Sequence, residues 1–393
     1  MRRSRLPAGG ANVFMKIRQK RAEAEAEGQR LLDLSIGEPK GAALQSARET
    51  AAQAVLSESE AMHAYQYNAS PGVPDFARRF VRAHLPDELP EGEVDYLPIA
   101  GIKPILGLLP LACGCADEDV TVMTMTKPGY PIPANWCAYH PRVTHAPLPL
   151  TTANAFRFTP ADVPPSTDLV MTNYPHNPSG QIAEAEWLRE LCQYCADNDI
   201  RLFNDAAYVA LSHDDAGVTL SEIAVEFPEL SWAEAFTAAK LIGNGTGWHV
   251  GAMAGSADFI GDMMEVKGKT DAGLVAPMAA GVIAALETDQ DGIAAYRAMY
   301  KERLAVLKDL MVAAGMRLAL DPRAGFYTLW DMPARAFGEP IESGEHFNFM
   351  MIERTGVVGV HFGDFLRYAV CADVASMEAD LVVAFRAAEV SYG

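Results

Sequence analysis

Short apolar runs alternate with longer amphipathic stretches along most of this chain, and this pattern constrains the fold more than any other feature. Residues 120–124, 168–172 and 200–204 have the composition of buried strands, and residues 183–198 have the periodicity of a helix. Strands joined by helical crossovers pair in parallel, with helices packed on both faces of the sheet. We therefore predict an α/β protein with a mainly parallel sheet.

The length of the chain and the pattern of its second half predict two domains. The chain has 393 residues, which is long for one hydrophobic core. Further strands are predicted at 250–255 and 326–330, one long helical stretch at 285–316 and an amphipathic helix at 377–390. With no internal repeat or flexible linker to divide the chain otherwise, we predict a large domain at 45–280. A smaller domain would combine residues 1–44 with 281–393.

The charge of the chain bears on its partners. The formal net charge is −19, which argues against nucleic acid and anionic membrane surfaces. No apolar run reaches the length of about 20 residues that a membrane-spanning helix needs. The basic start at residues 1–5 is not followed by a hydrophobic stretch, so we expect no secretory signal.

The cysteines favour a reducing compartment. There are six in the chain, and Cys192 and Cys195 form a C-x-x-C within a stretch predicted as helix. Neither Gly nor Pro shapes a redox loop there, and no second pair stands at zinc spacing, so no metal site is predicted. We expect two ordinary helical cysteines and a cytoplasmic location.

Three polar residues follow the ends of predicted strands, and together they predict a ligand site. Asn177, Asp205 and Lys240 each lie just beyond such a strand, and ligands of open α/β sheets bind at the carboxyl ends of strands. Lys240 follows a nearly apolar run, and a desolvated lysine can form a Schiff base with an aldehyde. Its nearby rivals, Lys267 and Lys269, lie in a polar stretch and are expected at the surface or an interface.

Local phrases around these residues resemble those of a known family. They are Asn173-Tyr174-Pro175-His176-Asn177-Pro178-Ser179-Gly180, Asn204-Asp205-Ala206-Ala207-Tyr208, Thr237-Ala238-Ala239-Lys240 and Phe365-Leu366-Arg367. In this order they resemble the fold-type I, class I/II aminotransferases that use pyridoxal 5′-phosphate, and the resemblance covers nearly the whole chain. It implies a mainly parallel seven-stranded sheet in a large domain with a smaller α+β domain. Taken singly, Asp205 could be a strand-end cap and Asn177 part of an ordinary turn.

The resemblance assigns the cofactor contacts. Lys240 would hold the cofactor as a Schiff base, and Asp205 would keep its pyridine nitrogen protonated. Tyr208 and Asn177 would hydrogen-bond its phenolic oxygen. Further contacts are implied for Tyr130, which would stack on the cofactor ring, and for the phosphate donors Gly101, Ile102 and Lys103. Thr237 matches the family's hydroxyl three residues before the lysine. The phrase at 100–103 resembles the diaminopimelate-type branch, as does the stretch at 267–273.

Two further positions concern the substrate and one the partner subunit. Arg367 would clamp the substrate α-carboxylate through two parallel hydrogen bonds. The backbone at Gly37 would lie against the substrate, where a side chain would crowd it. Tyr67 matches the tyrosine that reaches the phosphate of the partner subunit, which implies a homodimer with a shared active site.

The chain departs from the family at two places. The family has Gly-Trp-Arg eight residues after the lysine, whereas this chain has Gly247-Trp248-His249 at plus nine. His249 can still donate to phosphate, with less charge at neutral pH. The loop before Arg367 is short and lacks Pro-Gly, and His361 in it could enter the pocket or simply pack in the loop. Substrates of familiar members are therefore not carried over.

The resemblance implies an enzyme that moves an amino group between an L-amino acid and a 2-keto acid. The same scaffold also serves lyases, cyclases and oxidases of amino acids, which remain the alternative. A third possibility is a non-catalytic ligand sensor, which the intact set of site residues argues against.

Overall fold

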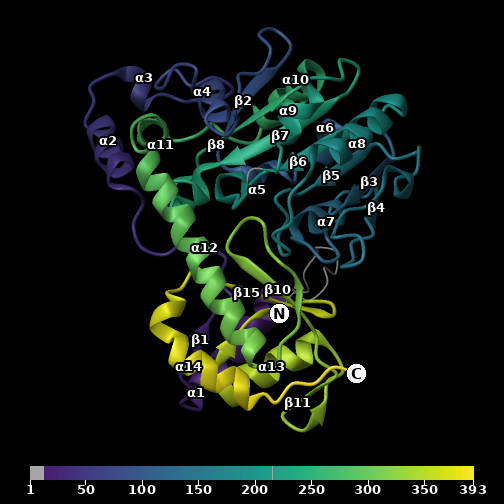
Figure 1. Ribbon diagram of the computed structural model, residues 1–393. Coiled ribbons are helices and arrows are strands. Elements are labelled where there is room, and N and C mark those ends of the chain that lie inside the picture. Colours follow the sequence, from purple (N-terminus) through teal and green to yellow (C-terminus); the bar gives the residue numbers. More distant parts are fainter. Residues whose placement is uncertain (1–12, 215) are drawn as a thin grey trace, which may run out of the picture.

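The structure, a computed structural model, describes residues 13–214 and 216–393 and is built around a seven-stranded sheet (Figure 1). Its strands run in the order β2-β8-β7-β6-β5-β3-β4. Only β8 is antiparallel to its neighbours. The predicted mainly parallel sheet is therefore confirmed. The strands are β2 (Asp95–Ile99), β3 (Val120–Thr124), β4 (Val143–Pro147), β5 (Leu169–Thr172), β6 (Arg201–Asp205), β7 (Trp232–Thr237) and β8 (Gly251–Gly255).

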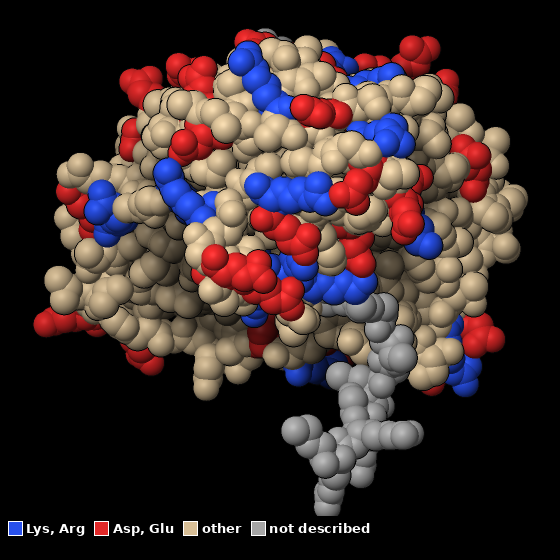
Figure 2. Space-filling view, turned by 90° about the horizontal axis from the view of Figure 1, so that it is seen from below, with Lys and Arg blue, Asp and Glu red and all other residues tan. Residues whose placement is uncertain are grey.

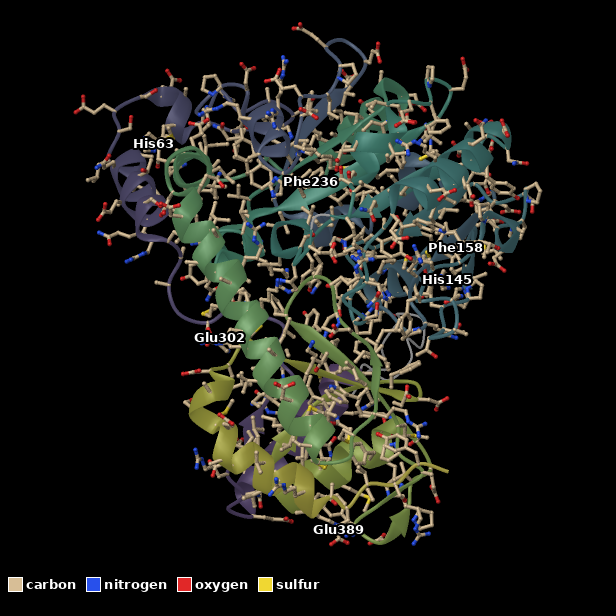
Figure 3. All side chains as sticks on the ribbon, viewed as in Figure 1. His63, His145, Phe158, Phe236, Glu302 and Glu389 are labelled. Carbon is tan, nitrogen blue, oxygen red and sulfur yellow. The ribbon has the colours of Figure 1, made fainter. Side chains whose placement is uncertain are left out.

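Helices cover both faces of this sheet, because successive strand residues point to opposite sides. Leu202 and Phe236 belong to one hydrophobic core, whereas their neighbours Phe203 and Ala235 belong to another. Phe236 lies in the middle of the sheet (Figure 3). The first core is closed by α2 (Gln45–Val55), α4 (Phe76–Arg82), α8 (Ala185–Asp197), α9 (Leu220–Ala224) and α11 (Ala276–Thr288). The second is closed by α5 (Ile102–Ile105), α6 (Leu109–Ala112), α7 (Ile132–Cys137) and α10 (Ala257–Lys267).

A smaller antiparallel sheet, in the order β14-β15-β10-β9, lies beside the large one and has its own core. Its strands are β9 (Leu318–Leu320), β10 (Tyr327–Asp331), β14 (Val360–Phe362) and β15 (Phe365–Ala369). Around it lie α1 (Val13–Ala26), α12 (Gln290–Ala313), α13 (Gly344–Thr355) and α14 (Val374–Ala387), and α12 runs from one part of the molecule to the other (Figure 1). Besides short 3₁₀ turns, the other elements are α3 (Glu60–His63), β1 (Leu32–Asp33), β11 (Arg335–Ala336), β12 (Glu339–Pro340) and β13 (Val357–Val358).

We propose that the domain division follows these two sheets, with a large domain at 45–280 and a smaller one from 1–44 and 281–393. The strands of the large sheet all lie between residues 95 and 255, and those of the four-stranded sheet between 318 and 369. Residues 1–12 of the proposed smaller domain lie outside the described part of the chain.

The prediction of one long helix at 285–316 is wrong, because the helical conformation is interrupted at Asp289. Helix α11 ends at Thr288, and α12 begins at Gln290. The Asp289 carboxylate accepts hydrogen bonds from Gly292 N at 3.0 Å and from Ser46 Oγ at 2.5 Å. An aspartate at this position satisfies backbone donors at the start of a helix and so favours a new helix over a continuous one.

The helices and the surface charges of the structure bear on contacts with membranes and partners. Within the described ranges, no helix combines the length and apolarity needed to cross a bilayer. On the face seen from the side of the smaller sheet, acidic and basic side chains are interspersed (Figure 2). Surface charges of both signs in close proximity favour solubility over a single-sign docking face.

A substitution at Gly281 tests the packing of α11 against α2. A Cβ at this position would lie 2.4 Å from the Ala47 carbonyl oxygen, so Gly281→Ala should force the two helices apart and lower the stability by roughly 1–3 kcal/mol. The matched control is Gly261→Ala in α10, where a Cβ meets no atom within 4 Å. That change should instead raise stability by about 0.5–1 kcal/mol, because alanine favours the helix. Thermal unfolding of both variants measures this, and equal effects would contradict the packing argument.

Candidate active site

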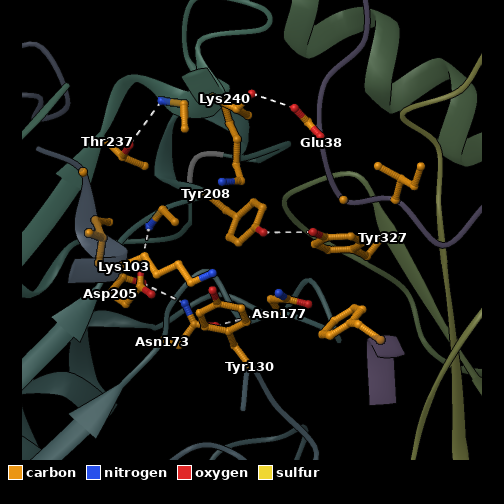
Figure 4. Close-up of a pocket in the computed structure, with 18 of the residues that line it drawn as sticks. Glu38, Lys103, Tyr130, Asn173, Asn177, Asp205, Tyr208, Thr237, Lys240 and Tyr327 are labelled. Atoms are coloured by element: carbon orange, nitrogen blue, oxygen red, sulfur yellow. Dashed lines mark hydrogen bonds between the residues drawn. The ribbon is translucent and has the colours of Figure 1, made fainter. Parts of the chain in front are cut away.

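A cavity of about 700 Å³ opens between the large sheet and the smaller one. It lies beyond the carboxyl ends of β5, β6 and β7, where the sequence places its site residues. All of the predicted site residues except Tyr67 line it: Gly37, Gly101, Ile102, Lys103, Tyr130, Asn177, Asp205, Tyr208, Thr237, Lys240, His249 and Arg367. Figure 4 shows part of this wall, with Asp205, Tyr208 and Lys240 labelled. Residues that are up to 330 positions apart in the sequence therefore share one cavity.

Lys240 lies in the wall of the cavity on a short 3₁₀ turn, Ala238–Lys240, directly after β7. The turn is capped by Thr237, whose Oγ1 accepts a hydrogen bond from Ala239 N at 3.2 Å. Burial lowers the pKa of the Lys240 amine, and the Asp205 carboxylate opposes this shift only in part. The amine is therefore more available as a neutral nucleophile than an exposed lysine.

Asp205 ends β6 and lies in the same wall. Burial raises the pKa of its carboxyl to about 6, against the opposing effects of the Lys240 charge and of a hydrogen bond from Ala207 N at 3.2 Å. Asn173 Nδ2 donates to the Asp205 carbonyl oxygen at 2.8 Å and so ties the end of β6 to the loop after β5. The carboxylate is thus buried with few partners, and a cationic ligand group would stabilise its charged form.

A polar network that the sequence reasoning missed lies beneath these two residues. The Asn204 side chain donates to Glu234 at 2.7 Å and to the Tyr174 carbonyl oxygen at 3.0 Å, and it accepts from Tyr174 N at 2.9 Å. Glu234 is fully buried and also accepts from Ser221 N at 2.7 Å. The network fastens the loop that carries Asn177 to β6 and β7. The signal for this network in the sequence was a glutamate within the otherwise apolar run 232–236.

Arg367 lies on β15 and faces the cavity from the side of the smaller sheet. Its Nη1 donates to Asn177 Oδ1 at 3.1 Å, and its Nη2 donates to the Ser35 carbonyl oxygen at 2.8 Å. Its Nε is buried and has no hydrogen-bond partner within the described chain. The guanidinium is therefore fixed in direction and retains unused donor capacity for an anionic ligand.

Tyr327 on β10 is a second residue that the sequence reasoning missed, having placed it only in a strand. Its ring centre lies 4.2 Å from the guanidinium carbon of Arg367, and its hydroxyl is 2.9 Å from that of Tyr208 (Figure 4). A Cβ at Gly37 would lie 2.0 Å from the Tyr327 hydroxyl. Gly37 is therefore crowded by Tyr327, a contact that no local phrase could predict.

The predicted phosphate donors also line the cavity, and they lie at the start of a short helix. Helix α5 has four residues and contains Ile102 and Lys103, and residues 106–108 separate it from α6. Pro104 and Pro110 lie in these two helices and lack the backbone N–H that a longer helix would use. His249 adopts a left-handed backbone with φ +54° and lines the same cavity.

Three expectations outside the cavity can be compared with the structure. Lys267 is not at the surface of the chain: it is fully buried and donates to the Tyr67 carbonyl oxygen at 2.9 Å and to Asp271 at 2.8 Å. His361 lies on β14 and not in a loop, with Nε2 3.3 Å from Glu345 of α13, and it does not line the cavity. Cys192 and Cys195 are unpaired, buried side chains of α8, as predicted.

Comparisons with known proteins agree with this geometry. The family model "Aminotransferase class I and II" matches residues 29–384, and the chain belongs to that family. It is 29% identical over 363 residues to the LL-diaminopimelate aminotransferase of Desulforudis audaxviator, covering 88% of this chain and 86% of the relative. The same enzyme of Moorella thermoacetica is 26% identical over 361 residues, covering 88% and 86%.

Solved structures confirm the fold. Substrate-bound BacF from Bacillus subtilis superposes with a TM-score of 0.85 at 19% identity, over 100% of this chain and 99% of that chain. The aspartate aminotransferase of Rhizobium meliloti gives 0.84 at 20% identity, over 99% and 98%. Family and fold together establish an enzyme of the fold-type I, class I/II aminotransferases, which transfers an amino group between an amino acid and a keto acid.

Asp205→Asn should stabilise the cofactor-free protein more at about pH 8 than at about pH 4. The folded-state pKa of about 6 lies above the ordinary 3.8, so ionising this carboxyl destabilises the fold. The resulting loss in the free energy of unfolding is absent below about pH 4 and grows between about pH 4 and pH 6. It reaches about 3 kcal/mol above pH 6. Thermal unfolding of the two proteins across this range measures it. The exposed Asp309→Asn on α12 is the control, and a gain independent of pH would contradict the assignment.

Proposed function

We propose that the chain binds pyridoxal 5′-phosphate and uses it to move an amino group between an L-amino acid and a 2-keto acid. The observation that carries this proposal is the meeting of three side chains in one cavity: Lys240 with its lowered amine pKa, the buried Asp205 carboxylate and the Arg367 guanidinium. Amino-acid chemistry on this cofactor requires an amine, an acid and a cation that binds the substrate carboxylate.

The cavity suits the cofactor in volume and in charge. Its volume of about 700 Å³ lies within the usual range for a small-molecule site. The Asp205 carboxylate is buried, and a protonated pyridine nitrogen would give it the cationic partner that burial otherwise denies it. In the same cavity, Lys103 and the backbone of Gly101 and Ile102 offer charge and N–H donors for a phosphate.

Each remaining contact has a distinct task. Bound pyridoxal phosphate would supply an aldehyde that condenses with amines and a ring that accepts electrons from the substrate Cα. Tyr208 and Asn177 would donate to its phenolic oxygen, Tyr130 would cover its ring, and Thr237 and His249 would add phosphate contacts. Tyr327 holds the Tyr208 hydroxyl in place from the other side.

Arg367 and Lys240 would act on the substrate itself. The guanidinium would bind the α-carboxylate, directed by its hydrogen bonds to Asn177 and Ser35. The Lys240 amine, whose pKa is lowered by burial, would accept the proton from the substrate Cα and deliver it to the neighbouring carbon of the cofactor. One lysine could thus hold the cofactor and move the proton.

We propose that the enzyme is a homodimer in which Tyr67 contacts the phosphate of the partner subunit. Tyr67 does not line the cavity of its own chain and is 47% exposed, and its ring lies 5.2 Å from that of Tyr65, which is 69% exposed. Two exposed aromatic side chains in contact favour a surface covered by another copy. Lys267 and Asp271 brace this loop from beneath.

We also propose a cytoplasmic location. All six cysteines are free, and five of them are buried. Unpaired thiols in a folded chain are typical of a reducing compartment.

Lys240→Ala tests the cofactor assignment. Protein loaded with pyridoxal phosphate should show a visible absorption band that bleaches when single amino acids are added without a keto acid. The variant should lose this band shift and its turnover, because Lys103, the other lysine among the described cavity residues, lies on α5 and not at the end of β7. Lys269→Ala, which removes an exposed lysine paired with Glu265, is the control. Turnover retained by Lys240→Ala would contradict the assignment, and a persistent band with product formation would favour a lyase, cyclase or oxidase.

A complementation experiment tests the shared site. Lys240→Ala and Tyr67→Ala subunits should each be inactive or weak as pure dimers. A mixed dimer keeps one intact site, with Lys240 from one subunit and Tyr67 from the other, so activity should return after the two are unfolded and refolded together. Sedimentation of each sample confirms the oligomeric state. Activity that is merely the average of the two variants would contradict a shared site.

A further inference from the structure

The described wall of the cavity contains two acids, Asp205 and Glu38. Asp205 is buried at the end of β6. Glu38 is exposed and lies in the β1–α2 segment, residues 34–44, which joins β1 to α2. In the proposed function, Asp205 faces a protonated ring nitrogen. Glu38 is then the acid of the described wall whose charge the cofactor does not use.

Glu38 is fastened to the lysine loop, residues 241–246, which directly follows Lys240. Thr246 Oγ1 lies 2.9 Å from Glu38 Oε1 and 2.8 Å from Asn244 Oδ1, so its proton is shared between a carboxylate and an amide oxygen. The carboxylate is the stronger acceptor of the two, because it is ionised. Figure 4 shows Glu38 and Lys240 on the same side of the cavity.

Further contacts hold the β1–α2 segment against the lysine loop. Leu44 N donates to the Ile242 carbonyl oxygen at 2.9 Å, and Asn244 Nδ2 donates to the Gly41 carbonyl oxygen at 3.2 Å. The hydrogen bond of Glu38 is thus one of several that join the two stretches. Its carboxylate has little freedom to move away from the lysine loop.

The same segment also contacts the proposed α-carboxylate clamp. The Ser35 carbonyl oxygen accepts from Arg367 Nη2 at 2.8 Å, and Gly37 lies against the Tyr327 hydroxyl. Between Ser35 and Glu38 the chain therefore passes from the guanidinium to the lysine loop. The placement of the lysine relative to the clamp depends on this short stretch.

The charged and titratable groups around Lys240 act on its amine in different ways. Burial lowers the pKa of the amine, whereas Asp205, Cys371 and Glu38 raise it. Burial raises the pKa of the Cys371 thiol to about 12, so this thiol is uncharged at neutral pH. The Tyr208 ring, whose centre is 5.1 Å from the amine, carries no net charge either. Once a cationic ring has paired with Asp205, Glu38 is the remaining negative charge among these groups.

We propose that Glu38 is a positioning residue for Lys240: held through Thr246, its carboxylate keeps the lysine amine basic enough to take up the proton of the substrate Cα. This inference rests on the proposed function, because it takes Lys240 as the group that moves that proton. A fixed negative charge stabilises the protonated form of a nearby amine. The hydrogen bond is needed because an exposed carboxylate that moves freely in water is screened by solvent and salt.

Acetylation of the cofactor-free protein measures the Lys240 amine directly. Acetic anhydride is uncharged and reacts with the neutral form of an amine, so its rate at each pH reports how much of the amine is neutral. The exposed Lys269 in the same sample is the internal reference, and mass spectrometry of the digested protein measures both lysines. Glu38→Gln keeps an acceptor for Thr246 but removes the charge. It should shift the Lys240 profile to lower pH and raise the relative rate at pH 7 about twofold to fivefold.

Three variants assign this effect to a fastened charge. Glu38→Asp keeps the charge and should retain most of the original profile. Glu302→Gln removes an exposed carboxylate of α12 that does not line the cavity, and it should leave the profile unchanged (Figure 3). Thr246→Val removes the hydrogen bond, so Glu38→Gln should have a smaller effect in that background than in the protein with Thr246.

The outcomes distinguish this inference from the proposed function. An unchanged profile in Glu38→Gln, or an equal change in Glu302→Gln, would overturn the role of the carboxylate. An equal effect of Glu38→Gln with and without Thr246→Val would overturn the fastening through Thr246. Loaded protein that shows no band shift with any amino acid would instead overturn the proposed function, and acetylation without cofactor would still decide the role of Glu38.

Turnover supplies a second readout for Glu38. Glu38→Gln should lower kcat about twofold to fivefold, because a less basic amine takes up the proton more slowly. KM for the amino acid should stay unchanged, because Arg367 keeps its contact with the Ser35 backbone. A rise in KM with an unchanged kcat would contradict a role in the proton transfer.

Discussion

The burial of Lys240 beside Asp205 is the constraint on which the rest of the site depends. Each group loses hydration in the cavity wall, and each partly compensates the other through its charge. The pair is kept there because β6 and β7 end side by side in a parallel arrangement. The same arrangement yields a nucleophilic amine and a buried acid that lacks a strong partner. Binding of a cationic ring would give this acid the partner that it lacks.

The substrate side of the cavity comes from the smaller sheet, and its parts support one another. Tyr327 lies against the Arg367 guanidinium, bonds to the Tyr208 hydroxyl and occupies the space above Gly37. These contacts join the two parts of the molecule across the cavity. A change in how the two sheets sit together would therefore shift the proposed carboxylate clamp and the cofactor contacts at the same time.

Local reasoning succeeded where the chemistry requires particular residues at the end of a strand. Asn177, Asp205 and Lys240 each follow a strand, so a shared sheet edge could be predicted without coordinates. Reasoning from local sequence failed where the environment of a residue is set by partners that are distant in the sequence. Lys267 lies in a polar stretch but is buried by the Tyr67 loop, and the network of Asn204 and Glu234 needs three neighbouring strands to form.

The sequence by itself determined the α/β pattern, the family and most of the residues that line the cavity, because periodicity and strand-end motifs are local properties. Tertiary structure decided which distant segments complete the cavity. Arg18 on α1 and Tyr327 on β10 belong to the wall only because the two ends of the chain pack around one small sheet. Contacts between segments hundreds of residues apart depend on how complete elements pack, and no short window of sequence contains that information.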